Sequence, residues 1–216
     1  MRRFLYCFLS LAPLVCGCGH NTPKLAKAEA TAGAKKYSLH DTYDHLRDCC
    51  TRRAYWAMRP YIDPAHCEDV LDLLIAVDEL LAANAGTQRA IRTACPTFPA
   101  ERLDLSTLAD NLDLFSRTVR FVSQQESGST GMVRVRIGDR SELSDLPFEN
   151  RHGYWVYMPG GSPADLLQVI RDMRVALDRI TLTLGDQPKS PEQIGNEYRL
   201  RIGPKLKRIS QLAGNS

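Results

Sequence analysis

The spacing of apolar residues changes twice along this 216-residue chain, and this change constrains the fold more than any other feature. Before residue 115, apolar residues recur at every third or fourth position, which is the period of an amphipathic helix. In the segment 132–137 they alternate, so that Val133, Val135 and Ile137 share one face of a strand. Beyond residue 162 the helical period returns. The sequence therefore predicts an α+β fold with N-terminal helices, an antiparallel β-meander and a long C-terminal helix.

Capping and turn residues place the ends of the expected elements. Ser38 is an N-cap residue, and Asp63-Pro64 has the cap-then-proline order of a helix start. Gly185 is a C-terminal stop, and Gly203-Pro204 is expected to break or kink the last helix. The predicted helices are 38–58, one opening at 63, 87–93, 106–114, 162–185 and one opening at 190; the predicted strands are 118–125, 132–137, 143–150 and 154–158.

The first residues have the layout of an export signal. Arg2 and Arg3 precede an apolar stretch from Phe4 to Val15, which is shorter than the roughly 20 residues that a bilayer-spanning helix needs. A basic start followed by a short apolar core and small residues is typical of a secretory signal. Residues 1–17 are therefore predicted to be a signal peptide.

The residues at the end of the apolar stretch indicate that the signal peptide is of the lipoprotein type. The run Val15-Cys16-Gly17-Cys18, with Leu14 before it, resembles the lipobox of bacterial lipoproteins. The resemblance implies that Cys18 is acylated and that the signal is cut before it; the alternatives are a plain cleaved signal and an unprocessed apolar start. Because Gly19 is not acidic, the family analogy favours a cell-envelope protein anchored by lipid, at the periplasmic side of the outer membrane where the host has two membranes.

The amino-acid composition divides the rest of the chain into a tether, a globular domain and a basic tail. Residues 18–37 have four lysines and a single large apolar residue, Leu25, so they are predicted to be a flexible tether. Residues 38–185 are expected to form the α+β globular domain, and 186–216 a basic helical tail. Residues 38–183 have 16 basic and 21 acidic side chains, so the basic excess lies in the tails. This distribution argues against a nucleic-acid partner.

A second resemblance concerns the domain itself. Helices followed by a short meander that ends in Gly153-Tyr154-Trp155 look like NTF2-like domains, over about residues 38–160. That family includes both enzymes and binding modules, so the resemblance implies a fold and leaves the function open.

Four cysteines lie beyond the signal, at positions 49, 50, 67 and 95. In an oxidising compartment an even count predicts two disulfides. Neighbouring helical residues project about 100° apart, so Cys49 and Cys50 are expected to reach different partners, one of them Cys67 and the other Cys95. The alternative is that Cys50 and Cys67 are buried thiols.

Two polar patterns in the sequence are candidate ligand sites. His40 and Asp44 form one i,i+4 pair, and Asp41, His45 and Cys49 follow one another at i,i+4 spacing on the neighbouring face of the same helix. These side chains could hold zinc together with His66 or Cys67. Such i,i+4 pairs are more often surface contacts, and no metal is predicted. The second pattern comprises Arg120, Arg134 and Arg136 on the outer face of the sheet, with Gly160-Gly161-Ser162 opening a helix, as an anion site; outward arginines more often only solubilise a sheet.

No nucleophile elbow, P-loop, dinucleotide fingerprint or EF-hand loop occurs in the sequence, and no catalytic residue or cofactor is predicted. The favoured hypothesis is a non-enzymatic module that binds a small ligand or another envelope protein, with Trp155 and Tyr157 lining its pocket or its core. The alternatives are a small envelope enzyme that pairs a cleft carboxylate with His152 or His45, and a spacer whose basic tail (Arg199, Arg201, Lys205, Lys207 and Arg208) lies on the membrane.

Overall fold

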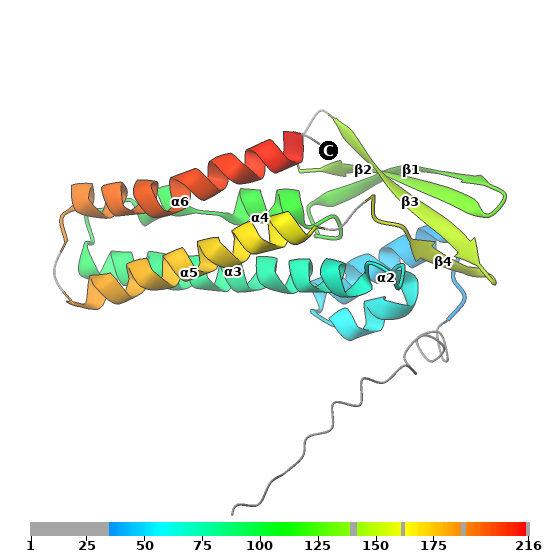
Figure 1. Cartoon of the computed structure of the whole chain (residues 1–216), viewed down its shortest axis with the longest axis horizontal. Helices are drawn as coiled ribbons and strands as arrows, with labels where there is room; N and C mark the ends of the chain where they lie inside the picture. Colours follow the sequence, from blue (N-terminus) through cyan, green and yellow to red (C-terminus); the bar gives the residue numbers. More distant parts are fainter. Residues whose placement is uncertain (1–34, 139–141, 161–162, 187–188, 215–216) are drawn as a thin grey trace, which may run out of the picture.

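The computed structural model describes residues 35–138, 142–160, 163–186 and 189–214, and confirms the α+β prediction (Figure 1). Helices precede a four-stranded antiparallel meander, and two long helices follow it. The elements are α2 (Leu39–Thr51), η1 (Tyr55–Tyr61), α3 (Cys67–Ala94), η2 (Ala100–Leu103), α4 (Ser106–Leu112), β1 (Val119–Ser127), β2 (Thr130–Ile137), β3 (Leu143–Arg151), β4 (Tyr154–Tyr157), α5 (Ala164–Asp186) and α6 (Pro191–Gly214).

Helix α2 begins where the sequence predicts and ends seven residues earlier than the predicted 58. The Ser38 hydroxyl accepts a hydrogen bond from the Asp41 backbone N–H, 3.1 Å away, and so caps the helix. At the other end Arg53 has a φ of 58°, and the Ala54 N–H donates to the Cys49 carbonyl at 2.8 Å. This left-handed residue and the 6→1 bond form a Schellman-type stop, after which the short 3₁₀ helix η1 begins.

Helix α3 joins two predicted helices into one of 28 residues. It starts at Cys67 because the residues before it pair with the sheet: the Asp63 N–H donates to the Tyr157 carbonyl at 2.9 Å. It continues through Gly86, around which a side chain would meet nothing within 4 Å. Leu80 and Thr87, on either side of Gly86, are buried. Tertiary packing therefore keeps the helix continuous where the sequence predicts a break.

The sheet has the strand order β1-β2-β3-β4, and the predicted alternation on β2 is confirmed. Val133, Val135 and Ile137 are buried, whereas Arg134 and Arg136 are exposed. Helix α2 packs on the buried face through its apolar side chains. One face of the sheet therefore belongs to the core, and the other faces solvent.

Two hydrophobic clusters form the interior. The sheet cluster joins the buried face of the sheet to α2, η1 and the first turns of α3. The bundle cluster joins the rest of α3 to α4, α5 and α6. Figure 1 shows these helices side by side at one end of the molecule and the sheet at the other. Helix α3 contributes to both clusters, with Leu74 in the sheet cluster and Val77 in the bundle cluster.

Helix α6 is a packed part of the bundle and not the separate basic tail that the sequence predicts for residues 186–216. Ile194, Tyr198, Ile202 and Ile209 are buried in the bundle cluster. The helix also continues through Gly203-Pro204, where a break or kink was expected. The basic side chains of Arg199, Lys207 and Arg208 are exposed, as in an ordinary amphipathic helix.

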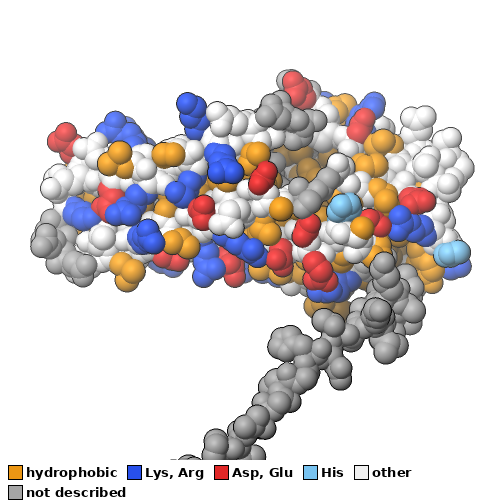
Figure 2. All heavy atoms as spheres, in the orientation of Figure 1, with side chains coloured by type: hydrophobic (Ala, Val, Ile, Leu, Met, Phe, Trp, Pro, Cys, Tyr) orange, Lys and Arg blue, Asp and Glu red, His pale blue; other side chains and the backbone are white. Residues whose placement is uncertain are grey.

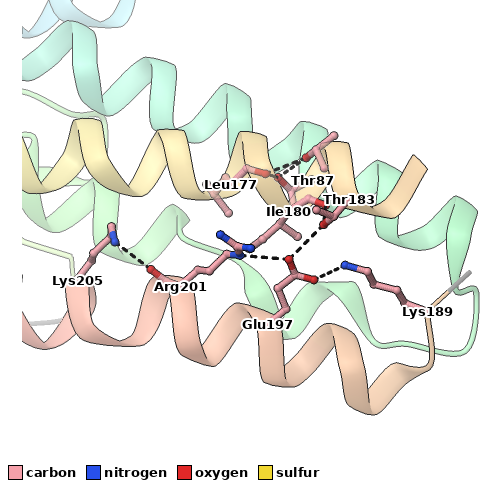
Figure 3. Close-up of polar contacts among 9 residues, drawn as sticks. Thr87, Leu177, Ile180, Thr183, Lys189, Glu197, Arg201 and Lys205 are labelled. Carbon is pink, nitrogen blue, oxygen red and sulfur yellow. Dashed lines mark hydrogen bonds and ion pairs between the residues drawn. The ribbon is translucent and has the colours of Figure 1, made fainter. Parts of the chain in front are cut away.

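A polar network ties α5 to α6 beside this apolar contact (Figure 3). One oxygen of Glu197 accepts hydrogen bonds from the Thr183 hydroxyl at 3.2 Å and from Arg201 Nε at 3.1 Å, and its other oxygen pairs with Lys189. The Glu197 side chain is only 17% exposed. Burial alone would raise the pKa of its carboxyl, but the bonds from Lys189, Thr183 and Arg201 outweigh burial and lower the pKa.

We expect E197Q to destabilise the domain by about 2 kcal/mol at neutral pH, because three donors lose a charged acceptor. A carboxyl whose pKa falls on folding stabilises the protein above its ordinary pKa of about 4.5, and this stabilisation is lost as the pH falls through the lowered value. The difference between wild type and E197Q should therefore shrink between pH 7 and pH 3 in urea-unfolding curves. E79Q, which removes an exposed pair with Arg174, is the control and should cost less than about 1 kcal/mol.

Candidate functional site

A half-open apolar pocket lies where the two hydrophobic clusters meet. Its volume is about 170 Å³. The walls come from α3, from the end of α4 with the segment after it, and from the end of β4 with the residues after it. Figure 2 shows hydrophobic side chains at the surface in the region between the helical end and the sheet. The lining residues are Val70, Leu73, Leu74, Leu112, Leu114, Phe115, Tyr157, Pro159, Gly160 and Pro163.

The pocket exists because neither cluster fills the seam between them. On the side of the chain that leaves β4, the pocket wall consists of Pro159, Gly160 and Pro163, which have small or rigid side chains that cannot reach across the space. A dry cavity of about 150 Å³ lined by Leu, Ile and Phe is enough to hold benzene.

Tyr157 is the one polar side chain in this lining. Its ring meets Phe115 edge-on, with centroids 5.5 Å apart, and Phe148 at 5.6 Å. Burial raises the pKa of the Tyr157 hydroxyl to about 12, so the group keeps its proton at neutral pH. Within the described ranges the hydroxyl has no hydrogen-bond partner. It can therefore donate to, or accept from, whatever enters the pocket.

A buried polar cluster holds the segment of the pocket wall that follows α4. The Cys50 thiol donates to one Asp113 oxygen at 3.2 Å, and the Phe115 N–H donates to the other at 2.9 Å. Burial raises the pKa of the Asp113 carboxyl, and burial and Asp113 raise that of Cys50. Both carboxyl oxygens of Asp113 accept a hydrogen bond, so this cluster fixes the backbone at Phe115, whose side chain lines the pocket.

A second, polar hollow of about 550 Å³ lies beside the first turns of α2. It brings His45 together with three carboxylates, which is the combination that the enzyme hypothesis requires. Each carboxylate is engaged locally, Asp41 by Ser38, Asp44 by His40 at 3.3 Å and Asp48 by Arg52 at 2.9 Å. The lining residues are Lys35, Lys36, Tyr37, Asp41, Asp44, His45 and Asp48.

His45 itself is held by aromatic contacts. Its ring stacks on Tyr37 with centroids 5.1 Å apart and meets Tyr61 edge-on at 4.9 Å, while its Nε2 lies 3.5 Å from the Cys49 sulfur. Across the described ranges, no three His, Cys, Asp or Glu side chains are grouped so that they could hold a metal ion. The potential zinc ligands on α2 form pairwise contacts: the pair of His40 with Asp44 is exposed, whereas the contact of His45 with Cys49 is partly buried.

The four cysteines beyond the signal are buried free thiols in this structure. Cys49, Cys50 and Cys67 lie in the sheet cluster, whereas Cys95 lies in the bundle cluster after the end of α3. The 28-residue helix between Cys67 and Cys95 is about 42 Å long. The structure therefore does not bring Cys95 to Cys67 or to the sheet cluster, contrary to the expected pairing, because a disulfide needs Cα atoms within about 7 Å. A disulfide among the other three stays a prediction.

The two aromatic residues singled out in the sequence have different positions. Trp155 is 5% exposed and lies in the sheet cluster, against Leu39 and over Gly131, where a Cβ would come within 2.8 Å of both side chains. Tyr157 lies in the same cluster and also lines the pocket. Cys18 lies outside the described residues. Sequence reasoning missed the leucines of the pocket, because three segments far apart in the chain supply its walls.

Comparison with family profiles, with curated proteins and with solved structures finds no match to this chain. No helix in the described part of the chain has the length and the apolar character of a membrane-spanning segment. The resemblances to bacterial lipoproteins and to NTF2-like domains stay predictions.

Proposed function

We propose that this chain is a lipid-anchored protein of the cell envelope whose domain binds another envelope protein. In this proposal Cys18 carries the lipid, and the apolar pocket at the seam receives one apolar side chain of the partner. The observation that carries the binding role is the pocket itself, an open space of about 170 Å³ lined by apolar side chains and Tyr157.

The size of the pocket favours a protein partner over a small molecule. Sites for drug-sized ligands usually enclose 300–1,000 Å³, which is well above the space here. Interfaces between proteins, by contrast, commonly depend on a few large side chains that fill pockets of the partner. A phenyl ring fits the volume, and a phenol also fits the unpartnered hydroxyl of Tyr157.

Toluene and p-cresol, which reproduce the side chains of Phe and Tyr, test the pocket directly. Both are expected to bind saturably at millimolar concentration and to shift NMR signals of Leu112 and Phe115. Y157F should weaken p-cresol about fivefold and leave toluene unchanged, because one neutral hydrogen bond contributes about 1 kcal/mol.

A pocket-filling variant links this test to the partner. L73W places a large ring in the space and should abolish binding of both probes, whereas L182W, at an exposed position on α5, should bind them normally. A photo-crosslinking residue at position 112 should capture one envelope protein in cells, and L73W should remove that product. Unchanged probe binding in L73W would contradict the proposal.

A further inference from the structure

The outer face of the sheet has two neighbouring arginines that form no ion pair with any residue in the described part of the chain. Arg120 on β1 lies directly opposite Arg136 on β2 in the strand register, and both side chains are exposed. Directly opposed residues have Cβ atoms about 5 Å apart, so two like charges at these positions destabilise the pair. Neither arginine forms an ion pair with a described residue within 4.0 Å.

Arg134, which lies on the same face of the sheet, does form an ion pair. Arg134 forms a two-point ion pair with Asp145 on β3, at 2.7 and 3.1 Å. The outer face is therefore not uniformly basic, and its free charge is concentrated at one end. Glu142 precedes the β3 partner of Arg136 and makes no ion pair with it in the described structure.

A polar hollow of about 510 Å³ lies at this end of the sheet. Arg120 and Arg117 line it, and neither pairs with a described acidic residue. Helix α4 supplies the opposite wall with Thr107, Asn111 and the carboxylate of Asp110, and Thr118 and Gly138 complete the lining. Hydroxyl and amide groups therefore surround an excess of positive charge.

We propose that the arginines at this hollow bind a compact anion of the phosphate monoester type: Arg117 and Arg120 line the hollow, and Arg136, which is not part of its lining, lies opposite Arg120 in the strand register. A dianion placed between the guanidinium groups of Arg120 and Arg136 would accept charge-assisted hydrogen bonds from both, and it would offset the repulsion between their charges. Arginine suits this role because its planar fork meets two phosphate oxygens at once. The shared chemistry covers both a free phosphate and the headgroup of a lipid.

The site is tested by thermal unfolding of the full-length protein in sodium phosphate and in sodium chloride of equal ionic strength. Phosphate should raise the midpoint saturably, since a ligand that binds only the folded state stabilises it by mass action. R120Q and R136Q should each weaken the phosphate effect at least tenfold. In chloride R136Q should unfold at the same temperature as wild type or higher, because the repulsion is gone.

R134Q is the matched control, since it removes one positive charge from the same sheet face without touching the opposed pair. It should keep phosphate affinity within twofold of wild type. An equal loss in R134Q, or a phosphate effect no larger than that of chloride, would overturn the site. Glycerol phosphate separates the two sources: tighter binding than inorganic phosphate indicates a lipid headgroup, and weaker binding indicates a free phosphate.

Discussion

Replacing Cys18 with serine is expected to abolish incorporation of labelled palmitate into the protein. Acylation as in bacterial lipoproteins needs the cysteine sulfur, which serine lacks. More than one acyl chain gives stable membrane attachment, whereas a single chain binds only marginally, so an intact anchor also predicts recovery in the membrane fraction. The measurement is fatty-acid labelling in cells, followed by mass spectrometry of the N-terminal peptide.

Cys16 supplies the control for this prediction, since it lies two residues earlier in the same run. C16S should be labelled like wild type, because the resemblance assigns the lipid to Cys18. Labelling of C18S, or recovery of unlabelled wild-type protein that still begins with Met1, would show that the chain is not a lipoprotein. The pocket and the arginine hollow would keep their geometry in that case, and their probe tests would still apply.

The second large effect is expected in the core. W155A should reduce the free energy of unfolding by about 3–5 kcal/mol, because it leaves a cavity beside Leu39 and over Gly131. Most domains are stable by only 5–15 kcal/mol in total, so this loss leaves the sheet end marginal. Urea unfolding followed by far-UV circular dichroism gives the difference.

The chain has one other tryptophan, which serves as the matched control. Trp56 on η1 is 76% exposed. W56A therefore deletes an indole ring that lies in solvent, and it should change the free energy of unfolding by no more than about 0.5 kcal/mol. A cost of less than 1 kcal/mol for W155A would mean that the ring does not pack against α2 as described.

Those parts of the fold that depend on interactions between residues close together in sequence could be predicted. The alternation on β2 and the Ser38 cap are local signals, and the structure has both where they were expected. The errors in helix length arose where a distant contact outweighs a local signal. The sequence predicts one helix opening at 63 and another at 87–93, yet α3 runs through both because buried residues on either side of the expected break pack into the core.

The candidate sites were predicted less well. Tyr157 was singled out, but the leucines around it belong to segments 40 or more residues away, and no local pattern connects them. Arg120 and Arg136 were placed on one face from their alternation, whereas their direct opposition depends on the strand register. A shift of one residue would have moved each side chain to the other face.

The sequence alone determined the order of helical and strand regions and the face that β2 buries, because the hydrophobic period acts within a few residues. Only the tertiary structure decided that α6 belongs to the bundle, that Cys95 lies far from the other thiols, and that a pocket opens at the seam. Each of these features depends on how two segments that are distant in sequence pack together. Burial of their apolar surfaces against one another determines that packing.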